Sequence, residues 1–124
     1  MSLLLNKAMM VAAYEFFAAS KPFCDWNLPD AEEVEFVIAK TPSLYGWHQV
    51  EVTGRGKTRK LKHYITISIG RNGHTDTFMR TMAHEMVHLV DDQNCLSRNA
   101  EHGPAFKKLA REVAKHHGFD PLAM

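Results

Sequence analysis

The sequence is poor in the features that define several protein classes. It has two cysteines among 124 residues, so it can form at most one disulfide and cannot build a four-cysteine zinc ribbon. No run approaches the roughly 18 uninterrupted apolar residues of a membrane-spanning helix. The net charge of +1 gives no overall attraction to nucleic acid or to a membrane, so any such affinity has to come from a local patch.

The N-terminus also lacks the order of a secretory signal peptide. Its basic residue, Lys7, follows the leucine run instead of preceding it, and Glu15 interrupts the later apolar stretch. We therefore expect a soluble, cytoplasmic protein that has no contact with a membrane and whose cysteines, Cys24 and Cys95, are reduced thiols.

Alternating apolar residues predict a small sheet of three strands. The expected strands are Val34–Ala39, Trp47–Val52 and Tyr64–Ile69. In the third strand, Ile65, Ile67 and Ile69 are expected to share one face. Glycines and basic residues over 54–57 form a turn signal, so the second and third strands are expected to form a hairpin.

Apolar residues at helical spacing predict three helices. The expected helices are Leu3–Ala19, a second one from an N-cap at Thr75 or Asp76 to about Asp92, and a third one from Pro104 to Gly118. A polar loop over 93–101 joins the last two. The 124 residues are therefore expected to form one α+β domain, a small three-stranded antiparallel or mixed sheet packed with three helices.

The segment His84-Glu85-Met86-Val87-His88 carries the clearest chemical signal in the chain. In a helix, His84 and His88 lie one turn apart on one face, where both imidazoles can bind the same metal ion. Glu85 projects from the adjoining side, where a carboxylate can accept a proton from metal-activated water. The segment therefore predicts two metal ligands and a general base. Because a motif this short can occur by chance, the rest of the chain has to show whether these residues form a metal site.

A catalytic zinc site usually has three protein ligands, so a third one has to come from elsewhere in the chain. The candidates are Asp91, Asp92, Glu101 and His102, with His74, His116 and His117 further away. His102 is favoured because it precedes Gly103-Pro104 at the start of the third helix, where the returning chain can direct it at the second helix. Asp91 is expected to accept a hydrogen bond from the N–H of a ligand imidazole.

Two segments together resemble a known family. The run from Ala83 to His88, followed by His102-Gly103-Pro104-Ala105-Phe106, is similar to the SprT-like metalloprotease domain, which has HExxH on one helix and an HGxxF-type motif at the start of the next. The resemblance implies a zincin-like minimal domain with one zinc ion bound by His84, His88 and His102. It also implies that Glu85 is catalytic and that Phe106 packs between the two helices.

Members of that family often continue into a C-terminal zinc ribbon or into tails that bind DNA. Here about twenty residues follow the HG motif, so we expect a single domain over residues 1–124 without such a ribbon. The predicted activity is that of a zinc metalloendopeptidase, with a protein substrate that the resemblance associates with DNA. Tyr64 and His74 are the candidates for stabilising the oxyanion beside the metal.

Two other functions fit the same residues. The first is a zinc-holding domain without peptidase activity that serves as a DNA- or protein-binding module. The second is a hydrolase of another amide or ester bond, because the pair of metal and glutamate does not select the substrate.

Five positive charges lie within eight residues of the expected hairpin. They are Arg55, Lys57, Arg59, Lys60 and Lys62. Charge runs of this kind are usually solvated loops. The functional interpretation is a segment that contacts the phosphates of DNA, which the resemblance to SprT-like proteins favours.

Overall fold

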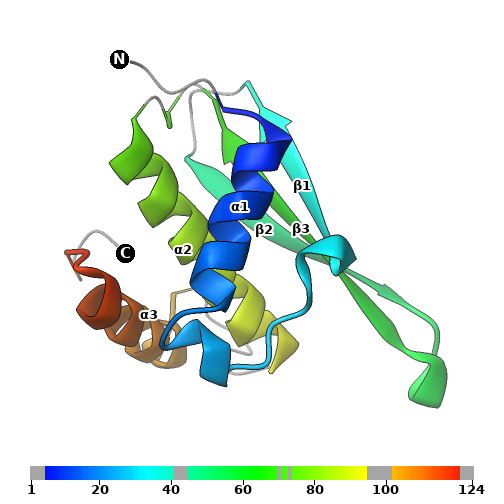
Figure 1. Cartoon of the computed structure of the whole chain (residues 1–124). Helices are drawn as coiled ribbons and strands as arrows, with labels where there is room; N and C mark the ends of the chain where they lie inside the picture. The colour runs from blue at the N-terminus through cyan, green and yellow to red at the C-terminus, as the bar shows by residue number, and fades with distance from the viewer. Residues whose placement is uncertain (1–4, 41–44, 70, 73, 95–101, 121–124) are drawn as a thin grey trace.

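The protein packs α-helices on one face of a three-stranded sheet: two of them contact the strands, and the third packs on the second helix (Figure 1). The computed structural model describes residues 5–40, 45–69, 71–72, 74–94 and 102–120. Its main elements are α1 (Lys7–Ala18), β1 (Val34–Ala39), β2 (Gly46–Thr53), β3 (Lys60–Ser68), α2 (Thr75–Gln93) and α3 (Pro104–His117). The expected α+β class is confirmed.

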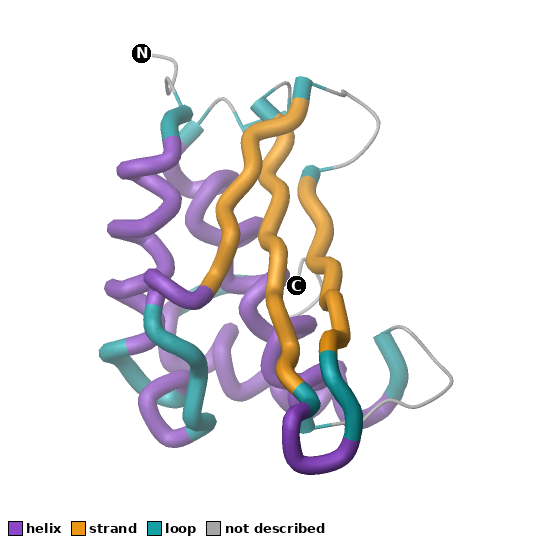
Figure 2. Tube along the Cα trace, turned by 90° about the vertical axis from the view of Figure 1, so that its right-hand side faces the viewer, coloured by secondary structure: helices purple, strands orange, loops and turns teal. Residues whose placement is uncertain are grey.

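The sheet is mixed, with β3 in the centre and the order β1-β3-β2. β1 runs parallel to β3, whereas β2 and β3 form the expected antiparallel hairpin. The connection of the hairpin contains a short 3₁₀ turn over Gly56–Thr58. Figure 2 shows the three strands side by side, with the helices behind one face. The end of the hairpin extends beyond the helices (Figure 1).

The third strand differs from its prediction at both ends. It begins at Lys60 and not at Tyr64, because Lys60–His63 pair with β2 although they lack the apolar alternation of a buried strand. It ends at Ser68, so Ile69 is not on the face shared by Ile65 and Ile67 and is 41% exposed. The chain turns there, and Asn72 Nδ2 donates to the Ser68 carbonyl (2.7 Å).

Two helices begin at other residues than predicted. α1 starts at Lys7, because the Asn6 side chain accepts a hydrogen bond from the Met9 amide (2.9 Å) and caps the helix there. α2 starts at Thr75 with His74 as its N-cap, so neither Thr75 nor Asp76 is the cap. The Asp76 carboxylate instead accepts from the Thr77 amide inside the first turn.

One hydrophobic core lies between α1, α2, α3 and the sheet. α2 is central to it, because it packs against both neighbouring helices and against β2 and β3. The largest fully buried side chains are Tyr14, Phe17, Phe23, Phe106, Met10, Ile65, Ile67, Met82, Met86, Leu89, Val87 and Val90. Such a core fixes α2 rigidly, which matters because α2 carries the HExxH segment.

α3 has the predicted boundary signals. Pro104 occupies its first turn, where no backbone N–H is needed, and Gly118 follows its last residue in the left-handed conformation (φ 75°). In the part of the chain that is described, none of the helices is long and apolar enough to cross a membrane. Cys24 is a free, exposed thiol, and Cys95 lies outside the described residues.

Candidate metal centre

α2 presents His84 and His88 on the same face, as their spacing predicts. Both side chains are partly buried, and their ring centroids are 4.9 Å apart. The opposite side of the helix carries Met82 and Met86, which are fully buried in the core. The helix is therefore anchored by its apolar face and holds the two imidazoles at the protein surface.

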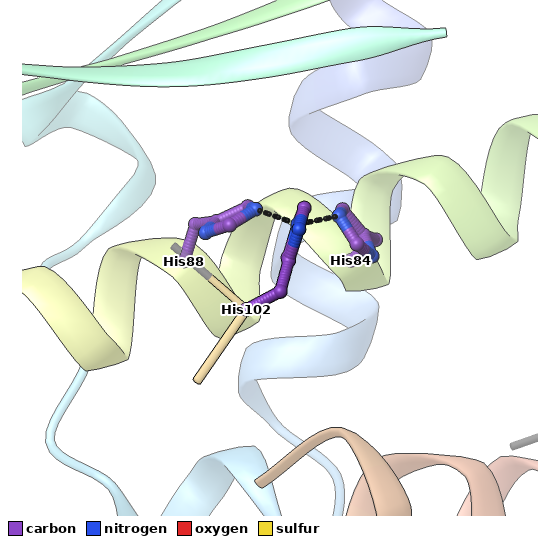
Figure 3. Close-up of side chains that lie close together, drawn as sticks. All are labelled: His84, His88 and His102. Atoms are coloured by element: carbon purple, nitrogen blue, oxygen red, sulfur yellow. Dashed lines mark hydrogen bonds between the residues drawn. The ribbon is translucent and has the colours of Figure 1, made fainter. Parts of the chain in front are cut away.

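His102 joins the two helical histidines from the turn before α3 (Figure 3). Its Nε2 lies 2.9 Å from Nε2 of His88 and 3.2 Å from Nε2 of His84. The backbone of His102 is left-handed (φ 58°), which few residues other than glycine adopt. This conformation turns the side chain back toward α2 instead of continuing into the helix that begins at Pro104.

The positions of the three Nε2 atoms suit the binding of one metal ion better than hydrogen bonds among the three imidazoles. His102 Nε2 has either a proton or a lone pair, so it cannot make two ordinary hydrogen bonds in the plane of its ring. Tetrahedral nitrogen ligands at about 2.0–2.1 Å from zinc lie roughly 3.3 Å apart, close to the observed separations. Among the described residues, His84, His88 and His102 are the group of metal-ligating side chains that converges in this way. The arrangement is compatible with one metal ion.

Two of these imidazoles are held in the neutral form that binds metals. Burial, followed by the nearby His102 and Arg80, lowers the pKa of His84 to about 4. Burial, followed by the charges of the neighbouring histidines, lowers the pKa of His88 to about 3. At neutral pH both imidazoles are therefore uncharged, and each can bind a metal ion through a lone pair without first releasing a proton.

Phe106 forms the floor of the histidine cluster. It is buried, and its ring centroid lies 5.1 Å from that of His84, 4.4 Å from that of His88 and 4.8 Å from that of His102. Because Phe106 belongs to α3, it fixes the distance between this helix and the imidazoles of α2. The predicted packing of this aromatic between the two helices is confirmed.

Glu85 lies beside the histidines in a pocket of about 270 Å³. The side chain is 3% exposed, whereas His102 at the rim is exposed. The residues that line the pocket are Tyr45, Gly46, Arg80, Thr81, His84, Glu85 and His102. A buried carboxylate next to two candidate metal-ligating imidazoles is compatible with a general base.

The pocket contains residues that the sequence did not single out. Arg80 lies four residues before His84, so helical spacing alone could have placed it on the same face. Gly46 is the first residue of β2 and Tyr45 precedes it, and no local pattern predicts that this strand passes beside α2. A Cβ atom on Gly46 would lie 2.6 Å from the Thr66 carbonyl oxygen, so the close approach requires glycine.

Several predicted alternatives lie elsewhere. Asp92 pairs with His48 and does not join the cluster (2.9 Å between Oδ2 and Nδ1). His116 and His117 lie in the last turn of α3. His116 Nδ1 faces the Glu112 carbonyl, and the ring of His117 packs against Phe17 of α1. Glu101 lies outside the described residues.

The remaining predicted roles concern the surroundings of the metal. Asp91 is buried on α2, and its role as an acceptor for a ligand imidazole stays a prediction. Neither oxyanion candidate lines the pocket: His74 is the exposed N-cap of α2, and the Tyr64 hydroxyl donates to Glu51. Arg80 and Tyr45 line the pocket, and the role predicted for His74 and Tyr64 stays a prediction.

The basic residues of the hairpin are all exposed. Arg55, Lys57 and Arg59 surround the 3₁₀ turn at its end, and Lys60 and Lys62 lie on β3. The turn with Arg55, Lys57 and Arg59 lies at the end of the hairpin that extends beyond the helices (Figure 1), whereas Lys62 lies 4.0 Å from Glu35 of β1. The contact with DNA that was predicted for them stays a prediction.

Comparison with known proteins adds no family to this description. No family model matches the chain, and neither a curated protein nor a solved structure matches it. The fold and the site by themselves define the chain as an α+β protein with a three-histidine candidate metal centre.

Proposed function

We propose that this protein is a zinc-dependent metallopeptidase of the SprT-like type. The observation that carries the proposal is the convergence of His84, His88 and His102 beside the buried carboxylate of Glu85. The sequence resemblance over the HExxH segment and the His102-Gly103-Pro104 turn supports it. Three neutral imidazole ligands suit zinc, and they leave the charge of the ion uncompensated.

The chain's own residues would perform the proton transfers and hold the substrate. A bound zinc ion would supply Lewis-acid activation of water and of the scissile carbonyl. Glu85 accepts the proton of the attacking water and donates it to the nitrogen of the leaving amine, which breaks the peptide bond. Arg80 and Tyr45 line the same pocket and have N–H and O–H groups that can donate to the oxygen of the attacked carbonyl.

The substitution Glu85→Gln tests the assignment of the base. The amide keeps the size of the side chain but cannot accept the proton, so cleavage of a disordered protein should fall by about 10²-fold or more. Zinc content should stay the same, because Glu85 is not a ligand. Metal analysis and a gel-based cleavage assay measure the two effects.

Glu112→Gln is the matched control, because it removes an exposed carboxylate on α3 far along the chain from the motif. It should cleave like the wild type. A Glu85→Gln variant that cleaves as fast as this control would exclude Glu85 as the base. Protein purified without any metal above background would remove the basis of the whole proposal.

The rival function is that of a zinc-holding module that binds DNA or protein. The basic hairpin favours it, because its five cations are exposed and do not line the pocket, and of these Lys62 lies 4.0 Å from the Glu35 carboxylate. Stoichiometric zinc without cleavage by the wild type, with and without DNA, would favour this module. Cleavage of a small ester or amide, but not of protein, would point instead to another hydrolase.

A triple variant tests the hairpin itself. Lys57→Ala/Arg59→Ala/Lys60→Ala should weaken the binding of single-stranded DNA and flatten its salt dependence, because fewer counterions are released. The matched control removes three exposed cations of α3 with Lys108→Ala/Arg111→Ala/Lys115→Ala. Fluorescence anisotropy at several salt concentrations measures both. Equal binding by the hairpin variant and the wild type would exclude the hairpin as a DNA contact.

A further inference from the structure

A second group of polar side chains lies beside the metal centre and has no role in the proposed chemistry. Asp92 on α2, His48 on β2 and His63 on β3 form a continuous chain. His48 Nδ1 lies 2.9 Å from Asp92 Oδ2, and His48 Nε2 lies 2.8 Å from His63 Nδ1. His48 therefore uses both ring nitrogens, one toward the helix and one toward the central strand.

The middle of this chain is buried. The His48 side chain is 1% exposed and His63 is 4% exposed, whereas Asp92 reaches the surface. Burial and the nearby His48 lower the pKa of His63 to about 4, and the hydrogen bond from His48 lowers the pKa of Asp92. At neutral pH an ionised carboxylate thus faces His48, and a neutral imidazole lies on its other side. A buried polar group of this kind lowers the stability of the fold when it loses its hydrogen-bonding partner.

The group is not a second metal site. His48 stands between its two partners and directs a different nitrogen at each of them, so the three side chains form a line and do not converge on one point. In the described part of the chain, the convergent group is the one made by His84, His88 and His102. The contacts of Asp92, His48 and His63 are those of a tether between elements.

The tether joins the two elements that build the pocket. Asp92 lies four residues after His88, and His84 lies four residues before it, so the three share one face of α2. His48 lies two residues after Gly46, which lines the pocket from β2. Gly46 and His48 face the same side of the sheet, because they are two residues apart on one strand. The tether therefore sets the distance between β2 and α2.

We propose that His48 is a positioning residue of the metal centre, which holds β2 at the distance from α2 at which an extended polypeptide fits the pocket. This inference rests on the proposed peptidase function. The bond from His48 Nδ1 to Asp92 connects β2 to α2, whereas the bond to His63 only connects two strands that the hairpin already pairs. The contact with Asp92 is therefore the one that determines substrate binding.

Two substitutions at one position separate the two contacts. The amide of asparagine can take the place of Nδ1, so His48→Asn keeps a donor for Asp92. The amide of glutamine reaches the place of Nε2, so His48→Gln keeps the contact with His63 and loses the one with Asp92. In a peptide-cleavage assay, His48→Gln should raise KM by about tenfold or more, which corresponds to a loss of about 1.4 kcal/mol in substrate binding when β2 is displaced from α2. His48→Asn should keep a KM close to that of the wild type.

The controls exclude a loss of fold or of metal. Gln49→Ala changes the next residue of β2, which is exposed on the other face, and should behave like the wild type. Zinc affinity should be the same in all four proteins, because the three ligands belong to α2 and to the turn before α3. Asp92→Ala should resemble His48→Gln in KM, since it removes the acceptor that His48 Nδ1 faces.

Amide hydrogen exchange of the zinc-loaded proteins gives a readout that does not depend on activity. Exchange over β2 should be about tenfold or more faster in His48→Gln than in the wild type, while His48→Asn stays close to the wild type. A wild type that cleaves no peptide would overturn the peptidase proposal, and the exchange experiment would still decide whether the tether exists. Equal exchange and equal KM in His48→Gln and the wild type would overturn the role of His48. An identical loss in the asparagine and glutamine variants would do so as well.

Discussion

His102 combines an unusual backbone with the outermost position in the cluster. Its left-handed conformation costs a residue with a Cβ atom roughly 1–2 kcal/mol, and nothing in the exposed side chain repays this by burial. Strain of this size persists where it serves a site. Here it directs the third imidazole at Nε2 of His84 and His88.

At this residue, stability and metal binding should therefore respond in opposite ways. In the metal-free protein, the free energy of unfolding of His102→Gly should exceed that of His102→Ala by about 1 kcal/mol, because glycine adopts a positive φ without a penalty. The glycine variant should therefore unfold at a higher urea concentration. Both variants should lose zinc affinity relative to the wild type. Urea denaturation with chelator and a zinc titration measure the two quantities. An alanine variant at least as stable as the glycine variant would contradict the argument.

The residues of the site differ in how far the sequence reveals them. His84 and His88 were predictable because their relation is set inside one helix. His102 was predictable from the Gly103-Pro104 turn that follows it, in combination with the resemblance. Tyr45 was not, because its place in the pocket depends on where β2 crosses α2, and that crossing is determined by long-range packing.

At the scale of elements, β2 is the strand that both lines the pocket and carries His48. Its first residue, Gly46, lies so close to β3 and α2 that a Cβ atom would meet the Thr66 carbonyl oxygen at 2.6 Å and the Thr81 methyl group at 3.1 Å. The strand can reach this position only without a side chain. The distance between the sheet and the metal helix thus depends on one glycine.

Gly46→Ala should test this dependence. The added methyl group meets a backbone atom, so the strand has to move, and we expect a loss of about 1–3 kcal/mol in the free energy of unfolding. The pocket should change with it, which cleavage kinetics would detect as a lower kcat/KM. Gln49→Ala on the same strand is the control for a simple change of strand propensity. Equal stability of the two variants would show that the contact is absorbed elsewhere.

The elements themselves were largely predictable, but their partners were not. Val34–Ala39 alternates so clearly that its strand was predicted residue for residue. That it pairs with β3 in parallel, and not with β2, has no local signal, because parallel pairing depends on the whole intervening chain. The start of β3 was missed for a related reason: Lys60–His63 are polar and extend the strand by pairing across the hairpin.

At the scale of the molecule, the metal site and the core are separate. The core lies between the helices and the sheet, while the three histidines contact it through Phe106, and His84 and His102 also line the pocket. A metal ion bound there would link α2, which carries His84 and His88, to the turn before α3, which carries His102. The fold should therefore survive without the ion, and the ion should add to its stability.

Zinc should raise the melting temperature of the wild type by mass action. At a free concentration of 100 times Kd, one site stabilises the folded state by about 2.7 kcal/mol. His88→Ala should show no such shift, and metal-free wild type should keep its helical circular dichroism. Thermal melts with zinc and with chelator measure both. An unfolded metal-free protein would show instead that the core depends on the ion.

The strand order of the sheet has a consequence for the way in which the chain is made. β1 and β2 are synthesised first, but in the described sheet each of them pairs with β3 and not with the other. A nascent chain that ends before Lys60 thus carries two strands without their hydrogen-bonding partner in the sheet. Until the central strand emerges, the backbone N–H and C=O groups of β1 are thus open to pairing with other polypeptides.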